Sequence, residues 1–171
     1  MSQFVSAMRG VAIAALVGGV AWTCPATATA DSNSAALAGM LSKGYNTSNC
    51  NAGALDQDDR GRGVLAGYEC GNNPLPGGPA KAAFALFDNA NDTAKGFKDL
   101  VSDLTLTPCA PGAQAPDVWH FKNSPDTPAG TVACGTGNGA VLLWTNDHNH
   151  MVGMVSGSDP KALYRWWLAN G

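Results

Sequence analysis

The stretch from Thr131 to Val155, TVACGTGNGAVLLWTNDHNHMVGMV, contains the clearest structural signals of the chain. The dipeptide Asn138–Gly139 separates two apolar segments, and it is the strongest two-residue hairpin signal because both turn positions need a positive φ. A polar cluster at residues 146–149 separates the second apolar segment from a third. The stretch therefore predicts three consecutive antiparallel strands, at residues 131–134, 140–145 and 151–155.

A helix is predicted directly after these strands. An aspartate–proline pair at residues 159–160 suits a helix start, because the aspartate can cap free N–H groups and proline lacks the N–H that would be left free there. Leu163, Trp166 and Trp167 follow at helical spacing, so we expect this face to be buried against the sheet. Tyr164, Trp166 and Trp167 are also the candidate ligand-binding residues, if one of their rings stays exposed.

The preceding part of the chain mixes helical patterns with breaker-rich connections. Residues 45–61 predict a loop, and the Pro- and Gly-rich residues 71–79 and 107–116 predict connections. Helices are predicted at residues 31–44, 79–89 and 92–104, and strands at residues 64–70 and 118–121. Since strands follow one another through tight turns, the predicted fold class is α+β, with an antiparallel sheet of about four to five strands packed by helices.

Residues 1–30 have the pattern of a secretory signal peptide. Arg9 supplies one positive charge, residues 10–22 are apolar, and residues 28–30 (Ala-Thr-Ala) form a small-residue cleavage motif. The apolar stretch is too short to span a bilayer core of roughly 30 Å. We therefore expect cleavage, after which residues 31–171 form a single secreted α+β domain outside the cell or in the cell envelope.

Four cysteines remain after the expected cleavage: Cys50, Cys70, Cys109 and Cys134. An even number in an exported chain indicates disulfides, and four cysteines permit three pairings. We favour Cys50–Cys70 and Cys109–Cys134, because each closes a local segment of plausible length. The spacings are too long for a structural zinc site, and no C-x-x-C pair suggests redox catalysis. Cys24 precedes the expected cleavage site, and its lipidation is left open.

The chain carries few charges: 13% of its 171 residues are charged, against about 25% in an average globular protein. Without residues 1–30 its formal charge is about −4. No run of lysine and arginine could neutralise a nucleic-acid backbone, and no amphipathic basic helix could lie on an anionic membrane. We therefore expect neither a nucleic-acid partner nor a stable membrane span, and no motif indicates a cofactor.

His148 and His150, with Asp147 beside them, come nearest to a metal-binding group. Alternate residues of a strand point to the same side, so two imidazoles could share a cation. Both histidines fall in or beside a predicted turn, however, and two ligands without a third make only a weak metal candidate. His120, on a predicted strand beside Trp119, is the third histidine that could act as a base.

Two further motifs resemble ligand-binding loops but lack an essential part. Residues 56–61 (DQDDRG) have acidic residues at the first and third positions of a calcium loop. The fifth ligand position is Arg60, which has no lone pair to donate, and the twelfth is Gly67 instead of glutamate. Residues 135–139 (GTGNG) lead into a predicted strand, whereas a phosphate-binding loop leads into a helix. We expect a solvated acidic loop and a hairpin, respectively.

The order of several features suggests a family. A Gly/Pro-rich segment is followed by an Ala/Phe segment, and then by Trp119, Cys134, residues 143–147 (LWTND) and residues 163–167 (LYRWW). In these features the chain resembles small secreted domains of unknown function of mycobacteria and related actinobacteria. It is also similar to some extracytoplasmic domains of their receptor kinases. The resemblance implies no active site.

Two functional hypotheses remain. The first is an exported, non-enzymatic domain that binds an envelope ligand or protein. The second is a secreted hydrolase or metal-dependent enzyme that uses His120, His148 or His150. An apolar groove beside the C-terminal helix would favour the first hypothesis, and a pocket in which a histidine and a carboxylate converge would favour the second.

Overall fold

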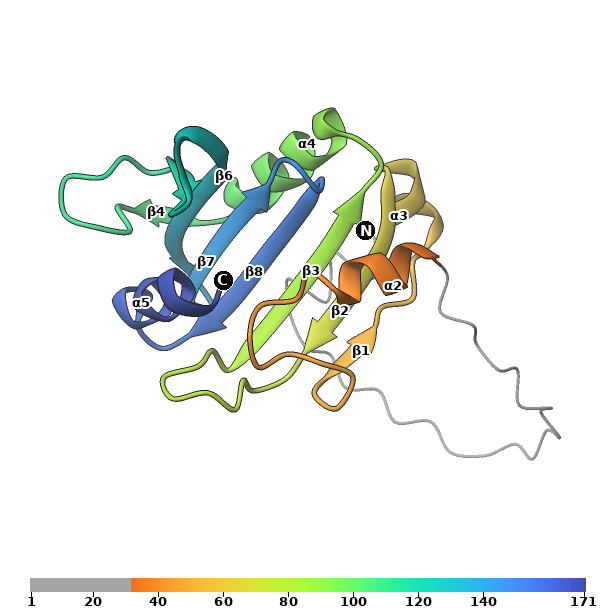
Figure 1. Ribbon diagram of the computed structural model, residues 1–171, viewed down its shortest axis with the longest axis horizontal. Coiled ribbons are helices and arrows are strands. Elements are labelled where there is room, and N and C mark those ends of the chain that lie inside the picture. Colours follow the sequence, from red (N-terminus) through yellow and green to blue (C-terminus); the bar gives the residue numbers. More distant parts are fainter. Residues whose placement is uncertain (1–31) are drawn as a thin grey trace, which may run out of the picture.

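The computed structural model describes residues 32–171, in which helices cover both faces of one antiparallel sheet (Figure 1). The expected signal peptide at residues 1–30 lies outside the described residues. The strands are β1 (Cys50–Ala52), β2 (Val64–Cys70), β3 (Lys81–Phe87), β4 (Thr105–Thr107), β5 (Asp117–Phe121), β6 (Ser124–Gly137), β7 (Gly139–Asn146) and β8 (Met151–Gly157). The helices are α2 (Ser32–Ala38), α3 (Gln57–Gly61), α4 (Ala90–Val101) and α5 (Pro160–Asn170). The strand order is β1-β2-β3-β8-β7-β6-β4, and β5 pairs with β6.

The meander of β6, β7 and β8 confirms the prediction made from residues 131–155. Gly137 of β6 pairs with Gly139 of β7, so Asn138 alone forms the tip of the hairpin. Within the dipeptide only Gly139 has a positive φ, of 122°, so the expectation of a positive φ at both positions was wrong. β6 begins earlier than predicted because its first half pairs with β5.

The helix predicted at residues 79–89 is instead strand β3, which lies between β2 and β8. Residues 82–87 are all buried, since α2 packs near one face of β3 and α4 near the other. A strand that is covered on both faces is a continuous apolar run, and periodicity does not distinguish such a run from a buried helix. The helical prediction was therefore wrong because β3 is buried on both faces and lacks the alternating pattern of a half-exposed strand.

Short elements raise the number of strands from the predicted four or five to eight. β1 and α3 lie within residues 45–61, which were predicted as a loop. Asp56 caps α3, and the carboxylates of Asp56 and Asp59 each accept the backbone N–H of the other residue in a capping box. The acidic residues that resemble a calcium loop therefore form a short helix.

The two longer helices follow their predictions more closely. α5 begins at Pro160, and the carboxylate of Asp159 caps it by accepting the backbone N–H of Lys161 at 2.9 Å. α4 begins at Ala90, before the predicted start at Asp92, because its cap is Asn89, whose side chain accepts the N–H groups of Asn91 and Asp92. Polar caps satisfy N–H groups that have no partner inside the helix, and two polar residues close together, such as Asn89 and Asp92, leave the exact cap position ambiguous in the sequence.

The sheet separates two buried cores. The front face is covered by α2, α5 and the loop of residues 39–49, and the back face by α4 (Figure 1). Alternation along β3 places Phe84 and Leu86 in the front core and Ala85 and Phe87 in the back core. The back core is small and mainly aliphatic, with the buried residues Val64, Ala85, Phe87, Phe97, Ala133, Leu143 and Val152.

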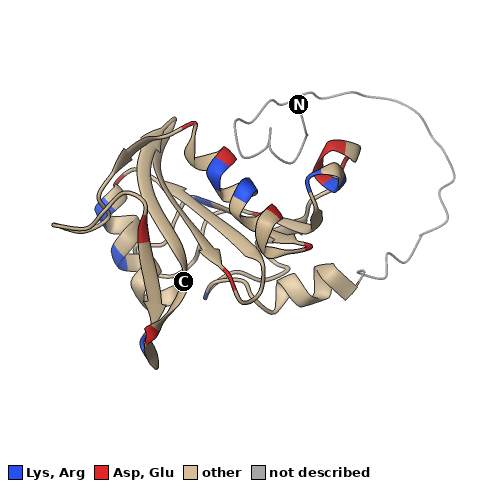
Figure 2. Cartoon of the chain, turned by 90° about the horizontal axis from the view of Figure 1, so that it is seen from above, with Lys and Arg blue, Asp and Glu red and all other residues tan. Residues whose placement is uncertain are grey.

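Charged residues lie mostly on the helices and turns, and the strands are nearly free of them (Figure 2). This distribution follows from burial, because an unpaired charge is costly to bury and the central strands are covered on both faces. Within residues 32–171, no helix is long and apolar enough to cross a membrane.

Both predicted disulfides are present, Cys50–Cys70 and Cys109–Cys134. Cys50 and Cys70 stand opposite each other in the register of β1 and β2, so their bond fastens the first edge of the sheet. Cys109 follows β4, where Thr107 pairs with Cys134 of β6. All four cysteines belong to the front core. Disulfides persist in oxidising compartments, so the pair indicates an extracytoplasmic environment.

Candidate functional site

A network of contacting aromatic rings runs through the front core. Successive ring centroids are between 4.8 and 6.1 Å apart, most of them in edge-to-face geometry. Its members come from the loop after α2, from three strands and from α5: Tyr45, Phe84, Trp119, Phe121, Trp144, Tyr164, Trp166 and Trp167. The network therefore links the interior to the surface where α5 lies near β5.

The three residues predicted to bind a ligand occupy different positions in this network. Trp166 and Trp167 are only 4% and 6% exposed, which confirms the expected burial of that helix face. Tyr164 is half-buried and stacks on Trp167 with centroids 5.9 Å apart. Neither indole of α5 is therefore a surface platform, and Tyr164 alone of the three reaches solvent.

Further apolar side chains of β5 and α5 belong to the same region, and the sequence did not predict them as ligand-binding residues. We define the aromatic ridge as Trp119, Phe121, Tyr164 and Leu168. Phe121 and Leu168 are 45% and 50% exposed. Trp119 connects β5 to α5, since its ring centroid lies 4.8 Å from that of Phe121 on β5 and 5.4 Å from that of Trp167 on α5. Leu168 lies one helical turn after Tyr164 on the same side of α5. The ridge can bind another molecule through apolar and aromatic contacts.

The base of the ridge is held by hydrogen bonds around Thr145, which is buried in β7. The indole N–H of Trp119 donates to the carbonyl oxygen of Thr145 at 2.8 Å. The hydroxyl of Thr145 accepts the backbone N–H of Thr131 at 2.9 Å and donates to the carboxylate of Asp147 at 2.6 Å. Gly130 lies against Thr145 so closely that a side chain there would collide with its carbonyl group. Trp119 is thus fixed before any ligand arrives.

This arrangement also explains the sequence LWTND at residues 143–147. Leu143 packs in the back core and Trp144 in the front core. Thr145 bridges β6 and β7, and the carboxylate of Asp147 accepts a hydrogen bond from its hydroxyl. The side chain of Asn146 accepts the backbone N–H of Asn149 at 3.3 Å in the following turn. Each member of the motif therefore has a structural role.

The histidines are not brought together into a centre. His120 is exposed on β5, and His148 is exposed in the turn between β7 and β8. His150 ends that turn with a φ of 51°, and its carbonyl accepts the backbone N–H of Phe87 at 2.9 Å. Among residues 32–171, no three His, Cys, Asp or Glu side chains lie close enough to hold a metal ion. The carboxylate of Asp147 is directed to Thr145 instead.

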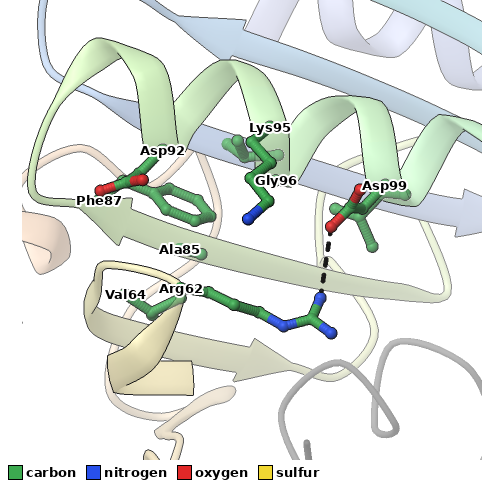
Figure 3. Close-up of a pocket in the computed structure, with 10 residues that line it drawn as sticks. Arg62, Val64, Ala85, Phe87, Asp92, Lys95, Gly96 and Asp99 are labelled. Atoms are coloured by element: carbon green, nitrogen blue, oxygen red, sulfur yellow. Dashed lines mark hydrogen bonds and ion pairs between the residues drawn. The ribbon is translucent and has the colours of Figure 1, made fainter. Parts of the chain in front are cut away.

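A shallow hollow lies on the back face between α4 and strands β2 and β3 (Figure 3). Val64, Ala85 and Phe87 form its floor, and Arg62 reaches across to Asp99, with 3.4 Å between nitrogen and oxygen. Its volume is about 40 Å³, whereas ligand pockets usually have several hundred. The hollow is thus a gap in the helix–sheet packing beneath an exposed ion pair.

A wider groove lies between α2, α3 and β2. Its volume is about 400 Å³, and its lining includes Ser34, Leu55, Arg60 and Leu65. Arg60 is the single charged residue of the lining, and it is exposed. No histidine–carboxylate pair lies in this groove, so it does not supply the pocket that the enzymatic hypothesis requires.

The pKa of Tyr45 is strongly shifted. Burial raises the pKa of its phenol to about 12, and the nearby side chain of Asn73 lowers it in part. The Asn73 amide is itself occupied, since it donates to the carbonyl of Lys43 at 2.9 Å and accepts the N–H of Leu75 at 3.0 Å. Among the described residues, the phenol oxygen has no partner that meets hydrogen-bond geometry. Tyr45 therefore acts as a core side chain.

Comparisons with known proteins found no relative of this chain. No protein-family model matches the chain, and neither a curated protein nor a solved structure matches it. The aromatic ridge is therefore the feature on which a functional inference can rest.

Proposed function

We propose that the chain is an exported, non-enzymatic binding domain that recognises an envelope ligand or protein through the aromatic ridge. We also propose that the chain is similar to small secreted domains of mycobacteria and related actinobacteria, and to some extracytoplasmic domains of their receptor kinases. The proposal also includes removal of residues 1–30 as a signal peptide.

The observation that supports the proposal is the exposure of Phe121, whose ring contacts that of Trp119, and of Leu168, which follows Tyr164 by one helical turn. Large apolar side chains that gather on a surface mark interaction sites, whereas single ones do not. The indole of Trp119 is already fixed by Thr145, so a ligand would lose little affinity to the ordering of this side chain. A preorganised apolar surface of this kind suits binding rather than bond cleavage.

The alternative remains a secreted hydrolase or metal-dependent enzyme that uses His120, His148 or His150. Such an enzyme needs a histidine oriented by a carboxylate or by a metal ion. The nearest carboxylate to His148 along the chain, that of Asp147, accepts a hydrogen bond from the hydroxyl of Thr145. The ridge therefore supports the binding function better than these histidines support catalysis.

The proposal is tested by sedimentation with envelope material. The purified protein is mixed with insoluble cell-wall fragments and, separately, with membrane vesicles from a cultured actinobacterium. We expect the protein to sediment with one of these fractions. The double variant Tyr164→Ala/Leu168→Ala should bind at least tenfold more weakly, because each lost apolar contact is worth about 1 kcal/mol.

The matched control is Lys95→Ala/Lys98→Ala on α4, which changes two exposed side chains of the opposite face and should leave binding unchanged. Equal sedimentation of the ridge variant and the wild type would contradict the use of the ridge. Absence of binding to both fractions would contradict the proposed function. Release of soluble products from the fragments, abolished by His120→Ala or His148→Ala, would support the enzymatic alternative.

A further inference from the structure

The chain contains two Asn-Gly pairs, Asn138–Gly139 and Asn170–Gly171, and the fold places them in opposite environments. Asparagine before glycine is chemically labile, because glycine has no Cβ to shield the backbone nitrogen that can attack the asparagine side chain. The two dipeptides are identical in sequence. Any difference in their reactivity within the folded protein must therefore come from their surroundings.

Asn138 alone forms the tip of the β6–β7 hairpin, between Gly137 and Gly139, which pair with each other. All three residues are exposed. Within residues 32–171, no hydrogen bond holds the side chain of Asn138. Its amide can therefore rotate toward the backbone nitrogen of Gly139 without the loss of a contact.

Asn170, the last residue of α5, is held on several sides. Its amide nitrogen donates to the carbonyl oxygen of Trp166 at 2.9 Å, and its own carbonyl accepts the backbone N–H of Lys43 at 2.9 Å. The backbone N–H of Gly171 donates to the carbonyl oxygen of Trp167 at 2.7 Å. Gly171 also lies so close to the indole of Trp167 that an added side chain would collide with it. An attack of the Gly171 nitrogen on the Asn170 side chain would break these hydrogen bonds.

We propose that Asn138 is a site of spontaneous covalent modification, at which the asparagine is converted to aspartate and isoaspartate through a succinimide. The backbone nitrogen of Gly139 attacks the Cγ atom of Asn138. A bond forms between these two atoms, the bond from Cγ to the side-chain nitrogen breaks, and ammonia leaves with the proton of the Gly139 N–H. Water then opens the ring at either carbonyl. The reaction requires water and no oxidant or reductant.

The modification changes the hairpin in two ways. A carboxylate replaces a neutral amide, so the tip gains one negative charge at neutral pH. Isoaspartate also lengthens the main chain by one carbon atom between Gly137 and Gly139, which a single residue now connects. We therefore expect the isoaspartyl form to lose the strand pairing nearest the tip. This inference does not depend on the proposed function, because Asn138 is not a ridge residue.

Peptide mass spectrometry measures the reaction at both sites. The folded protein, with both disulfides intact, is incubated at mildly alkaline pH in water enriched in a heavy oxygen isotope, so that products formed during the incubation carry the label. Asn138 should react at least tenfold faster than Asn170. In denaturant, with the disulfides reduced, Asn170 should react at least tenfold faster than it does in the folded protein, because its protection depends on the hydrogen bonds of α5.

Asn138→Gln is the matched variant. Glutamine keeps the amide but would have to close a larger ring, so residue 138 should stay unlabelled in a protein that folds like the wild type. Equal rates at Asn138 and Asn170 in the folded protein would overturn the proposal, as would labelling of residue 138 in Asn138→Gln at the wild-type rate. Aspartate without isoaspartate would indicate direct hydrolysis and would overturn the succinimide route. An Asn170 that reacts equally slowly in denaturant would overturn its protection by the fold.

Discussion

The front and back faces of the sheet are covered differently, although the same strands supply both cores. Two helices, a loop and both disulfides cover the front face, whose core consists largely of contacting aromatic rings. A single helix, α4, covers the back face over a smaller aliphatic core and leaves a hollow of about 40 Å³. The front packing extends to the surface as the aromatic ridge, whereas the back packing ends in exposed charges.

Substitutions should be costly at different kinds of position on the two faces. The front face has large side chains in mutual contact, so the loss of one ring leaves a cavity that its neighbours cannot close. The back face depends on the close approach of one helix to the sheet.

Trp167→Ala should lower the free energy of unfolding by about 3–5 kcal/mol, because a buried aromatic ring is removed from the centre of the front network. Denaturant unfolding followed by circular dichroism measures this loss. Leu168→Ala, its exposed neighbour on α5, should cost about 0.5 kcal/mol or less. Similar losses in the two variants would show that the front network is not the main source of stability.

Gly96→Val should destabilise the back face by about 1–3 kcal/mol through overpacking. Gly96 of α4 lies over the ring of Phe87, and an added Cβ would stand 2.5 Å from the Phe87 Cζ atom (Figure 3). Lys95→Ala, one residue earlier on the exposed side of α4, is the matched control. If Gly96→Val unfolds at the wild-type denaturant concentration, α4 does not need this close approach.

Tyr45→Phe should remove a pH dependence of the front face. Burial raises the pKa of Tyr45 from 10.0 to about 12 in the folded protein. The neutral phenol is therefore favoured by folding: its contribution is complete below pH 10 and is lost as the pH rises to about 12. The difference in unfolding free energy between wild type and variant should change by about 1–2 kcal/mol across this window. A constant difference would contradict the raised pKa.

Arg62→Ala should have the smallest effect, within about 0.5 kcal/mol. Arg62 and Asp99 are each 42% exposed, so solvent screens their ion pair across the hollow. Asp99→Asn should give the same result, and the double variant should show no coupling between them. A coupling energy well above 1 kcal/mol in a double-mutant cycle would indicate that the ion pair holds α4 on the back face.

Local signals were sufficient for several elements. The hairpin at Asn138–Gly139 and the capped start of α5 were correctly predicted because turns and caps satisfy backbone groups with nearby residues. The pairing of Cys50 with Cys70 was also correct, and it reflects a closure within one short segment. Each of these features depends on residues that are close together in the chain.

The candidate site was predicted only in part. Tyr164 was identified from its place in an aromatic helix, but Phe121 was considered only as part of a short strand. Its exposure follows from the position of β5 outside β6, which is a property of strand order and not of local pattern. The three apolar residues among the five of β5 were the available signal, and they would be equally consistent with a buried strand.

Local chemistry and cysteine count were thus enough to predict the meander, the cap of α5, the disulfides and the α+β class. Tertiary structure decided that residues 81–87 are a strand, because their uniform apolarity is explained only by helices on both faces. It also decided that Trp166 and Trp167 are buried while Phe121 and Leu168 are exposed. Exposure is set by which elements pack together, and no single stretch of the chain contains that information.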